Sequence, residues 1–150
     1  MNKTIRFALI LATVALVQPL HAASSTQMNV SVEVVARTIF NVTSQPASVN
    51  VTSADVARGY VEIPAAIAFQ VHSNARNGFT IQFQPVAEPF RQAQISWGTT
   101  TATVGSDGSW VAQQYEQGVR SGSMSVRLSL APSAIAATYA WPISVDANSL

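Results

Sequence analysis

Short runs of alternating apolar and polar residues, each ended by a turn signal, recur along this chain from residue 28 onward. Successive side chains of a β-strand point to opposite faces, so each run predicts a strand with one buried face. The runs predict seven or eight strands, and their spacing of roughly 8–12 residues is typical of an all-β sandwich. The runs span residues 28–34, 48–52, 60–63, 67–71, 79–83, 95–104, 124–130 and 139–145.

Several turn signals refine this expectation. Asn77-Gly78 predicts a hairpin between the runs on either side of it, because both residue types tolerate positive φ. Gly98 predicts a bulge inside its run. Pro142 cannot donate a ladder hydrogen bond, so the run 139–145 is expected at a sheet edge or at a bulge. Residues 110–116 fit either a helix or a strand.

The first residues have the layout of a secretory signal peptide. Lys3 and Arg6 precede an apolar run at 7–20, and the small residue Ala22 stands before the expected cut. The run is too short for a comfortable membrane span, which needs about 20 apolar residues. We therefore expect residues 1–22 to be removed and the mature chain to be exported, with no integral membrane segment.

The charge of the mature chain excludes some partners. Lys3 and Arg6 belong to the signal, so six of the eight basic residues remain against seven acidic ones, a formal charge of −1 (6 − 7). A nearly neutral, lysine-free chain has no basic patch for nucleic acid. The chain also has no cysteine, so its stability must come from packing or from a partner rather than from disulfides.

A catalytic or metal site is not expected. His72 is the one histidine of the mature chain, and it falls on the strand face opposite Phe69 and Val71, which favours a solvent-facing position. A Ser-His-Asp arrangement would need His72, but no G-x-S-x-G motif accompanies it. One histidine without cysteine disfavours zinc, and no glycine-rich phosphate loop is present. The sequence therefore predicts no enzyme, no cofactor and no metal.

Trp97, Trp110 and Trp141 raise the question of sugar binding. Tryptophan rings stack on sugars, but burial in the core of a sandwich is the commoner use of large aromatic side chains. Burial is the interpretation that the sequence favours for all three.

Several features follow one another in a telling order: the signal peptide, then Asn29–Val34, Ile39–Val42, Gln70–Asn74, Ile95–Gly98 and Tyr139–Val145. This order resembles pilus subunits of the chaperone–usher pathway, closest to the cysteine-free, colonisation-factor-type (alpha-class) fimbriae. The resemblance implies an immunoglobulin-like sandwich that lacks its last strand, with residues 23–36 as an N-terminal extension and 37–150 as the pilin domain.

The resemblance also implies how such a subunit works. A periplasmic chaperone lends the missing strand, and at an outer-membrane usher the extension of the next subunit replaces it. The chain would pass through the periplasm into a cell-surface fimbrium, most simply a homopolymer. Implied donor-strand residues are Met28, Val30, Val32 and Val34, and the implied edge of the acceptor groove carries Tyr139, Trp141, Ile143 and Val145.

Two other interpretations stay open. In the first, the chain is a self-contained secreted or periplasmic β-sandwich binding protein, and Met28–Val34 is simply the first strand of its own sheet. In the second, it is an exported enzyme, which would depend on His72.

Overall fold

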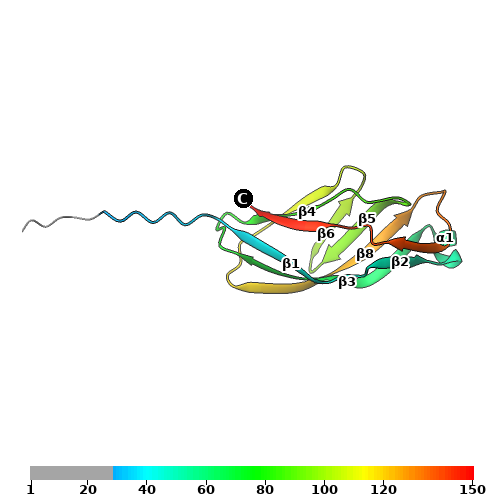
Figure 1. The fold of residues 1–150 in the computed structure, drawn as a ribbon, viewed down its shortest axis with the longest axis horizontal. Coiled ribbons are helices and arrows are strands. Elements are labelled where there is room, and N and C mark those ends of the chain that lie inside the picture. The colour runs from blue at the N-terminus through cyan, green and yellow to red at the C-terminus, as the bar shows by residue number, and fades with distance from the viewer. Residues whose placement is uncertain (1–28) are drawn as a thin grey trace, which may run out of the picture. The chain divides into compact units, whose positions relative to one another are not determined.

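Antiparallel strands make up most of residues 29–150, the part of the chain that this computed structural model describes (Figure 1). The predicted signal peptide and Met28 lie outside these residues. Residues 34–150 form one compact unit. The strands are β1 Thr38–Ser44, β2 Ser48–Val51, β3 Tyr60–Ser73, β4 Phe79–Phe83, β5 Phe90–Trp97, β6 Thr100–Val104, β7 Ser109–Gln113, β8 Val119–Leu130, β9 Ala137–Ala140 and β10 Val145–Ser149, with one helix, α1 Ser53–Arg58.

The strands form a sandwich, as predicted. One sheet has the order β1-β3-β8-β5-β6, a second has the order β10-β4-β7, and β2 pairs with β9 in a short ribbon. In an immunoglobulin-like sandwich, strands A, B, E and D share one sheet and strands C, F and G share the other. By their order, β1, β3, β8 and β5 correspond to A, B, E and D, and β4 and β10 to C and F.

The alternating runs supply the core. Met124, Val126, Leu128 and Leu130 of β8 are all buried, while Arg127 between them is exposed. Ile67 of β3 and Ile95 of β5 are fully buried beside them. The two-residue period thus predicts the inward face of the central strands correctly.

A bulge in β3 joins two runs that the sequence suggests are separate strands. Pro64 follows Ile63, and the register with β8 shifts between Ile63 and Ile67. Proline has no N–H for the ladder, so the strand leaves its partner here and then resumes. Ala65 has φ +49°, and its N–H donates to the Ser125 hydroxyl at 3.1 Å.

The prediction of a hairpin at Asn77-Gly78 is wrong. Strand β3 pairs with β1 and β8, whereas β4 pairs with β10 and β7, so this turn crosses between sheets. Gly78 has φ +96°, and a Cβ there would meet the carbonyl oxygen of Gln113. The glycine therefore serves a close backbone approach. The prediction of a bulge at Gly98 is also wrong. Trp97 pairs with Thr100, so Gly98, at φ +53°, lies in the two-residue turn of a β5–β6 hairpin.

The expected last strand, 139–145, is two strands. Tyr139 belongs to β9, which pairs with β2, and Val145 begins β10, which pairs with β4. Pro142 lies in the link between them, outside either ladder, so the lost donor costs no ladder hydrogen bond. Residues 109–113 form β7, which settles the helix-or-strand ambiguity of that segment.

The short helix α1 has strong signals at both ends. The Thr52 side chain accepts from the Asp55 N–H and the Asp55 carboxylate accepts from the Thr52 N–H, a capping box. Gly59, at φ +80°, ends the helix in the left-handed conformation. Hydrogen bonds from the side chain and backbone of Thr52, and then from Arg58, lower the pKa of Asp55 to about 2.

Candidate functional site

The segment ahead of β1 presents apolar side chains to solvent. Residues 29–37 belong to no strand, and Val30, Val32 and Val34 are 74%, 78% and 75% exposed. In an extended conformation these three side chains would lie on one face. They are the described members of the predicted donor set, and Met28 lies outside the described residues.

Two sheet edges lie near each other without pairing. Strand β1 ends the five-stranded sheet and β10 ends the three-stranded sheet, and within residues 29–150 neither has a partner on its outer side. At one end the Ser149 hydroxyl donates to Thr38 Oγ1 at 3.1 Å. At the other end Val42 and Val145 line a common cavity. The two strands therefore run antiparallel and close together, with Cα atoms within 8 Å of each other. A strand that enters the gap between their free edges must first part them.

The ladder with β4 fixes which backbone groups of β10 turn toward this gap. The Gln84 N–H donates to the Ser144 carbonyl at 3.0 Å, and the Leu150 N–H donates to the Gly78 carbonyl at 3.1 Å. Neighbouring residues of an antiparallel edge strand alternate between facing the partner strand and facing away. The N–H and C=O groups that face away from β4 therefore belong to Val145, Ala147 and Ser149.

The ladder with β3 does the same for β1. The Arg37 carbonyl accepts from the Asn74 N–H at 3.0 Å, so the alternate residues turn their backbone groups away from β3. These residues are Thr38, Phe40 and Val42. Their side chains are half-buried, so both edges direct side chains into the sandwich and backbone groups into the gap.

One backbone N–H on the free edge of β10 is already bonded to a side chain of the same strand. The Ala147 N–H donates to Oδ1 of its neighbour Asp146 at 2.7 Å. A charged side chain on an edge strand discourages uncontrolled pairing with other chains. Any strand that pairs here must take over this N–H from Asp146.

A cavity of about 330 Å³ with both polar and apolar walls lies at the Val42–Val145 end of the gap. Trp141 is part of its wall, and the indole Nε1 of Trp141 is buried without a hydrogen-bond partner among the described residues. An unpaired buried donor costs about 1–3 kcal/mol. The cavity is lined by Val42, Gln45, Pro46, Ala47, Ala140, Trp141, Ile143, Ser144 and Val145.

The structure brings together three of the four predicted acceptor residues. Trp141, Ile143 and Val145 share this cavity. Tyr139 does not join them. Its hydroxyl donates to the Ile135 carbonyl at 3.0 Å, and its ring packs against Phe90 in a T-shaped pair with the ring centroids 5.8 Å apart. No residue of β1 belongs to the predicted acceptor edge, although Phe40 and Val42 alternate with polar residues and are a usable signal.

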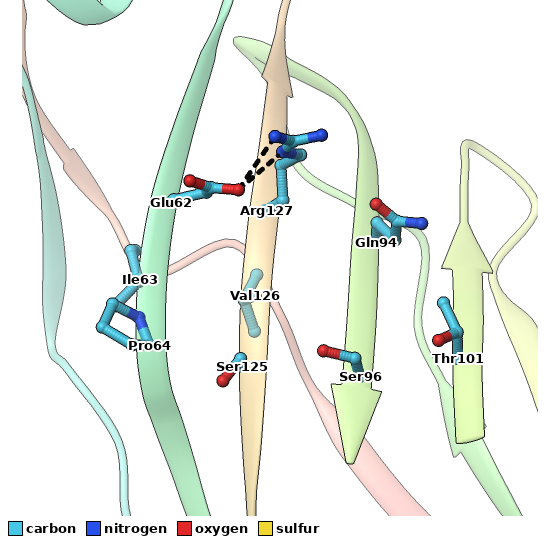
Figure 2. A pocket seen from close by; sticks show the side chains of 9 residues that line it. All are labelled: Glu62, Ile63, Pro64, Gln94, Ser96, Thr101, Ser125, Val126 and Arg127. Atoms are coloured by element: carbon cyan, nitrogen blue, oxygen red, sulfur yellow. Dashed lines mark hydrogen bonds and ion pairs between the residues drawn. The ribbon is translucent and has the colours of Figure 1, made fainter. Parts of the chain in front are cut away.

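A second, larger cavity of about 570 Å³ lies on the outer face of the five-stranded sheet, across β3, β8, β5 and β6 (Figure 2). Glu62 and Arg127 point toward one another there, with Arg127 Nε 3.0 Å from Glu62 Oε1. Arg127 also stacks over Tyr60 at 4.2 Å. The polar lining comes from Glu62, Gln94, Ser96, Thr101, Ser125 and Arg127.

This second cavity contains no arrangement for acid–base or nucleophilic catalysis. Its two charged groups neutralise each other, and its hydroxyl groups have no histidine beside them. His72 is exposed and lies at the far end of β3 from Glu62. Within residues 29–150, no three His, Asp or Glu side chains gather closely enough to hold a metal ion.

No protein-family model, no curated protein and no solved structure matches this chain. Among the described residues, no helix has the length and apolar character needed to cross a bilayer. The arrangement that distinguishes the described residues is the pair of free edges beside a cavity.

Proposed function

We propose that this chain is a structural subunit of a bacterial surface pilus, assembled by donor-strand exchange through a periplasmic chaperone and an outer-membrane usher. The observation that carries the proposal is that the unpaired edges of β1 and β10 lie beside each other, with a cavity at one end. A strand supplied by another molecule would bond to the outward N–H and C=O groups and place alternate side chains inside. That is binding by β-augmentation.

The valine-bearing segment supports the donor half of the proposal. Burying the exposed three quarters of Val30, Val32 and Val34 would contribute about 1–2 kcal/mol each, and each net ladder hydrogen bond about 1 kcal/mol more. A slip by one residue would bury Glu33 instead of these valines, so the pairing register is well specified.

The partners follow from this scheme. Before assembly, a chaperone strand fills the gap. In the fibre, residues 23–36 of another copy fill it, and a homopolymer results. The chain would cross the periplasm in transit and end in a cell-surface fimbrium.

The self-contained sandwich is the alternative. It requires residues 28–34 to be the first strand of the chain's own sheet. Residues 29–37 lie in no strand and their valines are exposed, which favours the pilus proposal.

Deleting residues 24–36 tests the proposal. The shortened chain should fold and still accept a donor strand, but it should not serve as donor to the next copy. Detergent-resistant ladders from cells that carry chaperone and usher measure this. A matched control replaces the polar-face residues Asn29 and Ser31 by alanine and should form ladders normally. Ladders from the deletion variant as long as those of the unaltered chain would refute the proposal.

A further inference from the structure

Trp110 is the exception among the tryptophans. Burial was expected for all three, and Trp97 and Trp141 are half-buried, but Trp110 is 67% exposed. It lies on β7, with its side chain on the outer face of the three-stranded sheet, because its neighbour Val111 packs against the core. An exposed indole of this size gives up a large hydrophobic stabilisation, which a ligand that covers it would recover.

The indole borders an open surface groove of about 540 Å³, wide enough for one face of a small ligand. The groove is formed by the end of β4, the Pro85 segment, the turn 105–108 and β7. Its residues are Gln82, Phe83, Gln84, Pro85, Asp107, Gly108, Ser109 and Trp110.

Hydrogen bonds and a close backbone approach fix the segments that form this groove. The Val86 N–H donates to the Gly105 carbonyl at 3.1 Å, and the Gly108 N–H closes the turn onto the same carbonyl at 3.3 Å. Gly108, at φ +73°, lies so close to β4 that a Cβ there would be 2.5 Å from the Phe83 carbonyl oxygen. The turn that carries Asp107 is therefore held in place before any ligand arrives.

Planar polar side chains surround the indole. Gln82 is the direct cross-strand partner of Trp110, which puts their Cβ atoms about 5 Å apart. Gln84 and Asp107 are exposed on the same groove. Within the described residues, the side chains of Gln82 and Gln84 make no hydrogen bond, and Asp107 accepts one, from Ser106 at 3.5 Å. Two amides and one carboxylate are thus free to bond a ligand.

We infer that this groove binds a saccharide. The apolar C–H face of a pyranose ring would stack on the Trp110 indole, and its hydroxyl groups would bond to the amides of Gln82 and Gln84 and to the Asp107 carboxylate. A flat aromatic surface beside side chains that both donate and accept suits a neutral polyhydroxyl ligand. The one charged group is acidic, which disfavours nucleic acid. A proline-rich peptide needs an aromatic-lined groove, and Trp110 is the single exposed ring here, since Phe83 is buried.

The site is separate from the proposed assembly edge. Strand β7 and strand β10 are the two opposite edges of the three-stranded sheet, with β4 between them. A strand docked beside β10 would leave Trp110 open. The saccharide site and the pilus proposal can therefore fail independently.

The test is a titration of the ¹⁵N-labelled protein, followed by amide and indole N–H resonances. The probes are methyl glycosides of galactose, glucose, mannose and N-acetylglucosamine. At least one probe should shift the Trp110 indole resonance and the amides of Gln82–Gln84 and 107–109 in a saturable way. Trp110→Ala should weaken that binding about tenfold or more, whereas Trp110→Phe should retain part of it.

Ile135→Ala is the matched control, because Ile135 is also 67% exposed but does not line the groove. It should leave the titration unchanged. Three results would overturn the inference. One is the absence of a saturable shift with every probe. Another is a shift that persists undiminished in Trp110→Ala. The third is a shift confined to the Glu62–Arg127 cavity or to a contact between copies.

Discussion

Replacing Val32 by aspartate separates the fold of this protein from its proposed assembly. Val32 is 78% exposed and belongs to no strand, so the substitution should change the stability of the isolated domain by no more than about 0.5 kcal/mol. In a donor strand the same side chain would lie inside the partner's sandwich. The substitution is therefore expected to leave the stability of the isolated domain unchanged and to weaken donor-strand binding severely.

The expected loss has two parts. The burial of valine, about 1–2 kcal/mol, disappears. The aspartate must then be desolvated or protonated inside the partner's sandwich, which adds at least about 2 kcal/mol. A total of roughly 3–5 kcal/mol corresponds to a hundredfold or greater weakening of donor binding.

Two measurements on purified protein check this. Thermal unfolding of the monomer should give the same midpoint for Val32→Asp and the unaltered chain. The protein concentration needed for polymer formation should rise by at least two orders of magnitude. Ser31→Asp adds the same charge one position earlier, on the face that would remain in solvent, and should polymerise normally. Equal polymerisation by both variants, or equal failure of both, would refute the alternating donor register.

Three further outcomes are expected. Ala147→Pro removes an N–H that faces the gap, so it should block donor binding while the domain stays folded. Asn148→Pro breaks the β4 ladder and should unfold the domain. Circular dichroism measures the folded state of both variants. Gly122→Ala places a Cβ 2.7 Å from the Phe69 ring and should destabilise the domain by about 1–3 kcal/mol in urea unfolding. Because the pKa of Asp55 is lowered from 3.8 to about 2, its ionised form stabilises the fold. The stability difference from Asp55→Asn should be complete above pH 3.8 and vanish toward pH 2.

Local pattern predicts the strand faces but not the strand partners. The alternation of Met124, Val126 and Leu128 marks their buried face without any knowledge of the sheet. The assignment of β3 and β4 to different sheets depends on contacts with β8 and β10, far along the chain. Asn77-Gly78 has the residue types of a hairpin turn, and nothing within a few residues of it reports those distant partners.

The candidate site is predicted in part for the same reason. Trp141, Ile143 and Val145 are neighbours in sequence, so one run points to all three. Tyr139 continues the alternation, but the chain changes sheets at the Pro142 link and carries Tyr139 away with β9. The exposure of Trp110 escapes prediction because Trp110 and Val111 are adjacent apolar residues. Only one of them can face the core, and hydrophobicity alone favours the larger.

The position of β10 also determines when the molecule can finish folding. Strand β4, at residues 79–83, is the middle of its sheet, yet one of its neighbours is residues 145–149, the last strand of the described chain. Such distant pairing is slow, because a long loop must close before any contact is gained. In a chain that emerges amino end first, one edge of β4 has no hydrogen-bonded partner until β10 has emerged. The place in the core that Ala147 fills is also empty until then. Protection from aggregation is needed most during that interval.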